Sequence, residues 1–139
     1  MCGITGFNSP HLSGQTLEKM TDVLQHRGPD ARGCYFDETK NIGLGHRRLS
    51  ILDLTDAANQ PMTSSSGRYI MVYNGEIYNF KQIGKKLNHQ FNTSSDTEVI
   101  LEAFEKWGVD FVHHLNGMFA IAIFDTLENI LYLFRDRLG

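Results

Sequence analysis

The sequence predicts a domain in which β-sheets are covered by helices, of either the α/β or the α+β class. Two helices with one apolar face are expected, at residues 15–25 and 96–107, and short apolar strands separate them. The continuous apolar run at residues 118–124 is typical of a strand buried on both faces. One-sided helices and buried strands are the components of layered folds, and periodicity alone does not choose between the two classes.

The first half of the chain is expected to contain one helix and three strands. Leu17, Met20 and Leu24 lie one helical turn apart and predict the helix at 15–25, which a Gly-Pro turn at 28–29 ends. The strands are expected at residues 3–8, 33–37 and 42–47.

The second half of the chain should begin with a strand at 68–73 and a short helix at 80–87. Ser95 and Glu98 then form a capping-box pattern that opens the helix at 96–107, and Gly108 ends it. Strands at 118–124 and 130–134 follow, and the chain stops at a charged segment, so we expect a fragment of a longer polypeptide.

Composition excludes several classes of function for this chain of 139 residues. Its net charge of −3 argues against a nucleic-acid partner, which requires a basic excess. A membrane span needs about 18 consecutive apolar residues, and the sequence contains no such run. Two cysteines, Cys2 and Cys34, do not make a disulfide framework, and the first residues do not form a signal peptide, so a cytoplasmic location is expected.

Cys2 is the sharpest chemical feature of the sequence. Removal of Met1 would place a thiol and an α-amine on one residue, and an α-amine with a pKa of about 7.7–8.0 is a suitable general base at neutral pH. The alternative is a cysteine that only begins a strand. Cys34, in a strand-like stretch, is expected to be a small core residue.

Asn74 and Gly75 follow a predicted strand and have two interpretations. An Asn-Gly pair after a strand is a common hairpin signal. A side-chain amide and a glycine N–H can also form an oxyanion hole, in which one donor is worth about 2.7–4 kcal/mol.

Arg48 and Asp96 could hold the two charged ends of an amino acid. Arg48 could pair in a bidentate manner with a carboxylate, or it could be a solvated strand-end residue. Asp96 could hold an ammonium group, or it could simply be an acid that the helix dipole favours. The six histidines and two cysteines lack metal-site spacing, so no metal is expected.

Considered together, these residues belong to a set of motifs that covers essentially the whole chain. The motifs are MCGITG at 1–6, HRGPD at 26–30, GHRRLSILD at 45–53, QPM at 60–62, YNGEIYN at 73–79, SDTE at 95–98 and NGMFA at 116–120. This set strongly resembles the glutaminase domain of glutamine-hydrolysing asparagine synthetases, which are class II glutamine amidotransferases.

The resemblance implies a fold and a set of site residues. The fold would be the N-terminal-nucleophile hydrolase sandwich, an α+β fold with four αββα layers of antiparallel sheets, which we expect to lack its last strands here. One amidotransferase domain would span residues 1–139 without the synthetase domain. Cys2 would be the nucleophile, Asn74 and Gly75 the oxyanion hole, and Arg48 the ligand of the glutamine α-carboxylate. Glu76 and Asp96 would lie at the amino-acid end of the substrate, and Leu49, Ile51 and Leu52 would contribute main-chain contacts.

The resemblance also implies a reaction and partners. Glutamine would be hydrolysed to glutamate and ammonia through a Cys2 thioester, without a cofactor in this chain. In a longer parent, a synthetase domain would use ATP and Mg²⁺ to convert aspartate to asparagine, and the parent could be a homodimer. Two alternatives stay open: transfer to another acceptor, such as a cell-envelope sugar or a natural-product intermediate, and a non-catalytic glutamine-binding module.

Overall fold

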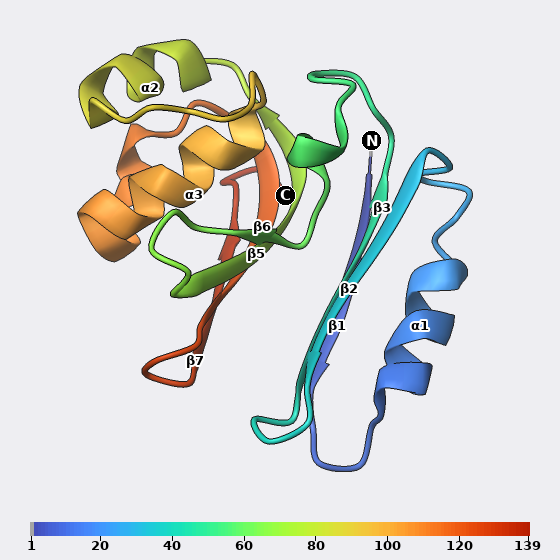
Figure 1. Ribbon diagram of the computed structural model, residues 1–139. Coiled ribbons are helices and arrows are strands. Elements are labelled where there is room, and N and C mark those ends of the chain that lie inside the picture. The colour runs from blue at the N-terminus through green and yellow to red at the C-terminus, as the bar shows by residue number, and fades with distance from the viewer. Residues whose placement is uncertain (1) are drawn as a thin grey trace.

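A computed structural model describes residues 2–139 of the chain, and it contains two antiparallel sheets that lie face to face. Helix α1 covers the outer side of one sheet, and helices α2 and α3 cover the outer side of the other (Figure 1). The layers therefore follow the order helix, sheet, sheet, helix. The antiparallel pairing decides the class that periodicity had left open, and the expected α+β sandwich is confirmed.

The first sheet consists of the strands nearest the N-terminus. These are β1 (Gly3–Asn8), β2 (Ala31–Asp37) and β3 (Ile42–Arg48), in the spatial order β1-β3-β2. Helix α1 (Gly14–Asp22) begins at Ser13, whose side chain accepts a hydrogen bond from Thr16 N at 3.3 Å. The helix ends three residues before the predicted Gln25, because the chain turns there toward Gly28.

The second sheet consists of later strands and carries the longer helices. Its strands are β4 (Met62–Thr63), β5 (Tyr69–Ile77), β6 (Gly117–Asp125) and β7 (Ile130–Arg135), in the order β4-β5-β6-β7. The helices are α2 (Phe80–Leu87) and α3 (Asp96–Trp107), and short 3₁₀ turns lie at Asp56–Ala58 and Gly108–His114. The predicted bounds of α2 and α3 are confirmed.

Strand β5 runs straight through Asn74 and Gly75, so the hairpin interpretation of this pair is wrong. The two residues pair with Ala120 and Phe119 of β6. Glycine is required at position 75, because a Cβ there would lie 2.2 Å from the Met118 carbonyl oxygen. The pair therefore lies on an extended strand.

Two apolar clusters hold the layers together. The larger lies between the second sheet and its helices and includes Met71, Ile77, Ile100, Phe104 and Phe111. The smaller fills the space between the sheets and consists of Ile42, Leu44, Ile70, Val72, Ala122 and Phe124. As expected, β6 contributes to both clusters. The relative position of the two sheets is thus set by apolar packing along β3, β5 and β6.

The start of α3 uses only half of the predicted capping box. Ser95 Oγ accepts from Glu98 N at 3.5 Å, as the pattern requires. The Glu98 carboxylate instead accepts from Asn92 N at 2.9 Å and Thr93 N at 2.7 Å. It therefore fixes the loop before the helix, which leads directly to Asp96.

Cys34 is exposed, so its prediction as a core residue is wrong. It lies on β2, an edge strand, and its Sγ lies 3.4 Å from Thr21 Oγ1 of α1 at the rim of that interface. No helix within the described part of the chain is long and apolar enough to cross a membrane.

Candidate active site

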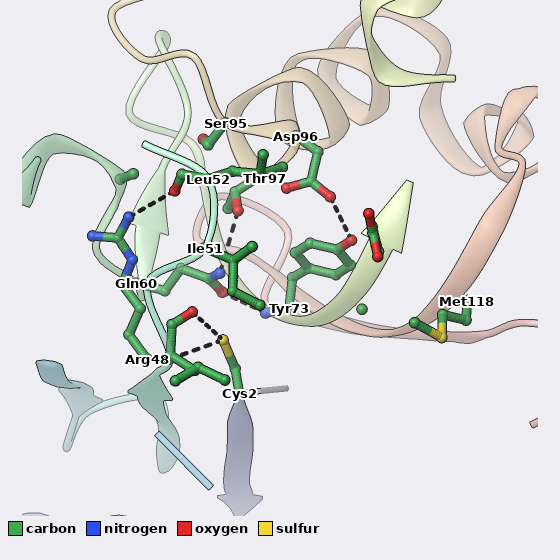
Figure 2. Close-up of a pocket in the computed structure, with 14 residues that line it drawn as sticks. Cys2, Arg48, Ile51, Leu52, Gln60, Tyr73, Ser95, Asp96, Thr97 and Met118 are labelled. Atoms are coloured by element: carbon green, nitrogen blue, oxygen red, sulfur yellow. Dashed lines mark hydrogen bonds between the residues drawn. The ribbon is translucent and has the colours of Figure 1, made fainter. Parts of the chain in front are cut away.

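A cavity of about 100 Å³ lies where the ends of the two sheets meet the beginning of α3 (Figure 2). It collects the predicted site residues from distant parts of the chain. Cys2, Arg48, Leu49, Ile51 and Leu52 line it from the first sheet and its following loop, and Gly75, Glu76 and Asp96 line it from the second half. Of the predicted site residues, only Asn74 does not line this cavity.

Asn74 lies beside the cavity and lines a neighbouring groove instead. Gly75 and Met118 line both spaces, so the groove adjoins the cavity at these residues. The Oδ1 atom of Asn74 is buried and has no hydrogen-bond partner within residues 2–139. A buried polar atom without a partner is costly, which makes Asn74 a candidate for a functional contact.

The Cys2 thiol lies just before β1 and is held by the backbone of Leu49. Leu49 N donates to Sγ at 3.4 Å, and Sγ lies 3.8 Å from the Leu49 carbonyl oxygen (Figure 2). Arg27 Nε donates to the Cys2 carbonyl oxygen at 3.1 Å. The predicted removal of Met1 concerns a residue outside the described part of the chain.

The turn at residues 26–30 fixes the backbone on which the site is built. Gly28 packs so closely on β3 that a Cβ would lie 2.4 Å from the Arg47 carbonyl group. Asp30 N donates to the Arg48 carbonyl at 3.0 Å, and its carboxylate accepts from Ser50 N at 2.7 Å. This turn therefore orients the segment that carries Arg48 and Leu49.

Arg48 is buried, contrary to the alternative of a solvated strand end. Its Nη1 donates to the Thr55 carbonyl and to Asn59 Oδ1, each at 2.8 Å. Its Nη2 donates to the carbonyls of Leu52, at 3.2 Å, and Asp53. Both Nη atoms thus hold the loop after β3. Because their N–H groups are already donated, a bidentate contact with a ligand carboxylate would require the loop acceptors to move away.

The edge of β5 that faces away from β6 presents three backbone N–H groups, and two of these belong to Tyr73 and Gly75, which line the cavity. Phe119 N donates to Asp136 Oδ2 at 2.9 Å, and the Phe119 carbonyl accepts from Asp136 N at 3.0 Å, so both backbone groups point away from β5. Gly75 of β5 is paired with Phe119, and its own N–H therefore points away from β6. Tyr73 N and Ile77 N point the same way, because residues two apart share a direction, and they donate to Gln60 Oε1 at 2.6 Å and Asp96 Oδ2 at 3.1 Å. Strand β4 pairs with β5 only as far as Met71. Within residues 2–139, the Gly75 N–H has no such side-chain acceptor and lines the cavity.

Asp96 is fixed through one of its two oxygens. Oδ2 accepts from the Tyr73 hydroxyl at 2.7 Å (Figure 2) and from Ile77 N at 3.1 Å. No donor within the described residues reaches Oδ1. Asp96 is buried except toward the cavity, which distinguishes it from an exposed acid that only complements the helix dipole.

The cavity thus has a cation on one side and carboxylates on the other. Arg48 supplies the positive charge, and Asp96 with the exposed Glu76 supplies the negative charge. The thiol of Cys2 and the open N–H of Gly75 also line it. This arrangement suits a zwitterionic amino acid with a reactive carbonyl group.

Comparison with known families agrees with this geometry. Residues 1–139 match the glutamine amidotransferase domain family. The chain belongs to this family. Among known proteins, it is 41% identical to asparagine synthetase [glutamine-hydrolyzing] 3 of Bacillus subtilis, over all of this chain and 24% of that protein. It is 38% identical to the amidase chry2 of Gibberella zeae, over all of this chain and 23% of that protein.

The fold of the amidotransferase domain is also found among solved structures. The glutamine phosphoribosylpyrophosphate amidotransferase of B. subtilis, complexed with ADP and GMP, superposes with a TM-score of 0.70 at 22% identity. The match covers 97% of this chain and 36% of that one. This likeness shows the fold, and the chain spans about a quarter of the length of the relatives named above.

Several residues that line the cavity have no role in the sequence-based prediction. Gln60, Tyr73, Thr97 and Met118 belong to the quoted motifs, but the motifs do not say what they do. Ser95 was expected only as a helix cap, and nothing in the sequence marks Ala58. No group of three or more His, Cys, Asp or Glu side chains within residues 2–139 is arranged to hold a metal ion.

His46 gives the domain a buried titratable group next to the site. It lies on β3, is 1% exposed, and its Nε2 has no partner in the described part of the chain. Burial lowers the pKa of His46 to about 4, assisted by the charge of Arg48 and opposed by a hydrogen bond with the Tyr73 backbone. The side chain is therefore neutral near pH 7 in the folded protein.

We expect His46 to make the domain less stable as the pH falls from about 6.5 to about 4. In this window the unfolded chain binds a proton at His46 and the folded chain does not, so the free energy of unfolding decreases, by on the order of 3 kcal/mol. Urea unfolding at pH 7 and pH 4.5 measures the change. His46→Gln should lose most of this pH dependence, whereas His11→Gln, at an exposed histidine, should keep it. An unchanged slope in His46→Gln would contradict the assignment.

Proposed function

We propose that this chain hydrolyses glutamine to glutamate and ammonia, with Cys2 as the nucleophile. The observation that carries the proposal is the open Gly75 N–H, which lines the same cavity as the Cys2 thiol and lies on the strand that bears Asn74. A nucleophile beside an unpaired backbone donor is the arrangement that acyl transfer requires. Membership in the glutamine amidotransferase family supports glutamine as the acyl donor.

The charged groups of the cavity would orient glutamine. Its α-carboxylate would lie toward Arg48 and the main chain of Leu49, Ile51 and Leu52. Its α-ammonium would lie against Asp96 Oδ1, with Glu76 adding negative charge. The side-chain amide then points toward Cys2. Since the Nη atoms of Arg48 hold the loop, Arg48 acts on the carboxylate through its charge and its Nε–H.

The reaction would proceed through a thioester. The α-amine of Cys2 takes the proton of the thiol, the thiolate attacks the amide carbon, and the oxyanion accepts hydrogen bonds from Asn74 Nδ2 and Gly75 N. The C–N bond then breaks, and the α-amine of Cys2, freed by removal of Met1, returns a proton to the leaving ammonia. Water attacks the γ-glutamyl thioester, which releases glutamate and restores the thiol.

We further propose that the ammonia is used by a synthetase domain in a longer parent chain. There ATP and Mg²⁺ would activate aspartate, ammonia would convert it to asparagine, and the parent could be a homodimer. Neither ATP nor Mg²⁺ is assigned to residues of this chain. The asparagine synthetase among the relatives supports this acceptor. The relative named an amidase, at 38% identity, keeps a different acceptor as the second candidate.

The proposed hydrolysis can be tested directly on the purified protein. Glutamate release from glutamine is measured, and the intact mass is recorded before and after treatment with a glutamine-like electrophile. We expect loss of one Met, one adduct on Cys2, and glutamate release. Glutamine binding in calorimetry without glutamate release from processed protein would favour the non-catalytic binding module.

A further inference from the structure

We infer that Tyr73 is a positioning residue that makes the site selective for a substrate with an α-ammonium group, because its hydroxyl holds Asp96 in place. The inference rests on the proposed hydrolysis of glutamine and adds a residue to it. Tyr73 precedes the oxyanion pair on β5, and its side chain lines the same cavity (Figure 2).

The first step is the hydrogen bond between the two side chains. The Tyr73 hydroxyl donates to Asp96 Oδ2 at 2.7 Å, and Ile77 N donates to the same oxygen at 3.1 Å. Two donors thus occupy Oδ2 from the same strand. The carboxylate is turned so that Oδ1 is the oxygen left for a ligand. A cation in the cavity therefore meets a charge whose position is already fixed.

The second step is the clamping of Tyr73 itself. Its N–H donates to Gln60 Oε1 at 2.6 Å, and Gln60 Nε2 donates to Thr97 Oγ1 at 3.4 Å. Thr97 follows Asp96 on α3, so the four residues form a closed ring between β5 and α3. Tyr73 is 3% exposed and packs in the larger apolar cluster. The backbone N–H and the hydroxyl of Tyr73 are therefore both held by hydrogen bonds.

The third step concerns the charge of the phenol. Burial, together with the negative charge of Asp96, raises the pKa of Tyr73 far above its usual value. The hydroxyl is therefore protonated near neutral pH and can donate to Asp96. The hydrogen bond to Asp96 is thus already formed in the protein without a substrate.

The experiment compares glutamine with glutaramate, which has the same side-chain amide and carboxylate but no α-amino group. In Tyr73→Phe we expect kcat/KM for glutamine to fall about tenfold, mainly through KM, since a hydrogen bond to a charged group is lost. For glutaramate we expect a change of less than about twofold, because no ammonium contacts Asp96. In an Asp96→Asn background, Tyr73→Phe should have no further effect on either substrate.

Tyr69→Phe is the matched control. Tyr69 lies on the same strand, and its hydroxyl makes no hydrogen bond with any described residue, so the variant should match the wild type with both substrates. Thermal unfolding of both variants checks that the fold is kept. Equal losses for glutamine and glutaramate in Tyr73→Phe would overturn the inference alone. A wild-type protein that hydrolyses neither substrate would overturn the proposed function and the inference with it.

Discussion

Cys2→Ala is expected to abolish glutamine hydrolysis, with a fall in kcat of at least about 10⁴-fold, while the fold stays intact. The size follows from loss of the nucleophile, since no thioester can form and only binding and oxyanion contacts remain. Cys2 Sγ makes two backbone contacts with Leu49, of which the longer is 3.8 Å, so its removal disturbs little packing. Steady-state glutamate release measures the effect.

The chain offers its own control for this experiment. Cys34 is the second of two cysteines, is exposed, and lies on a strand away from the cavity. Cys34→Ala should retain wild-type activity and should still be labelled by a glutamine-like electrophile. Cys2→Ala should still bind glutamine in calorimetry. Wild-type hydrolysis by Cys2→Ala would refute the proposed mechanism.

Asn74→Ala is expected to lower kcat by about 10²- to 10³-fold with little change in KM. An oxyanion donor acts in the transition state and not on the bound amide, so the loss should be confined to the chemical step. The Oδ1 atom of Asn74 is buried without a hydrogen-bond partner in the described residues, and the proposed oxyanion donor is the Nδ2 atom of the same amide. The rate of electrophile attack on Cys2 should fall in parallel.

The control for Asn74→Ala is a second asparagine with no part in the site. Asn92→Ala removes an exposed side chain that makes no hydrogen bond with a described residue, and it should leave both kinetic constants unchanged. If Asn74→Ala raises KM as strongly as it lowers kcat/KM, Asn74 binds the ground state, and its assignment to the oxyanion hole is wrong.

Local signals in the sequence are sufficient for the elements whose ends are determined locally. The capping residue Ser95 and the stop at Gly108 define α3, and both ends of α2 are correct. The strand through Asn74 and Gly75 is different. Whether an Asn-Gly pair turns or extends depends on β6, which arrives from a distant part of the chain and pairs with both residues. No local pattern contains that information.

The site residues divide in the same way. Motifs identify Cys2, Arg48 and Asp96, and the structure places all three at one cavity. What each atom does there depends on contacts that the motifs do not record. The two Nη atoms of Arg48 are engaged by loop carbonyls, and Asp96 is turned by a tyrosine of another element. The sequence therefore predicts which residues form the site. Which of their oxygens and N–H groups are free to contact a ligand can be told only from the folded structure.

The backbone N–H groups on the edge of β5 are spaced at a fixed interval. Those of Gly75 and Ile77 are two residues apart, which is about 6.8 Å along an antiparallel strand. The first is the proposed oxyanion donor, and the second holds Asp96. If glutamine binds as proposed, the backbone repeat would help to set the separation between its side-chain carbonyl oxygen and its ammonium group. On the proposed roles of these groups, we expect the site to select by chain length, and asparagine, with one methylene fewer than glutamine, would be too short to satisfy both positions at once.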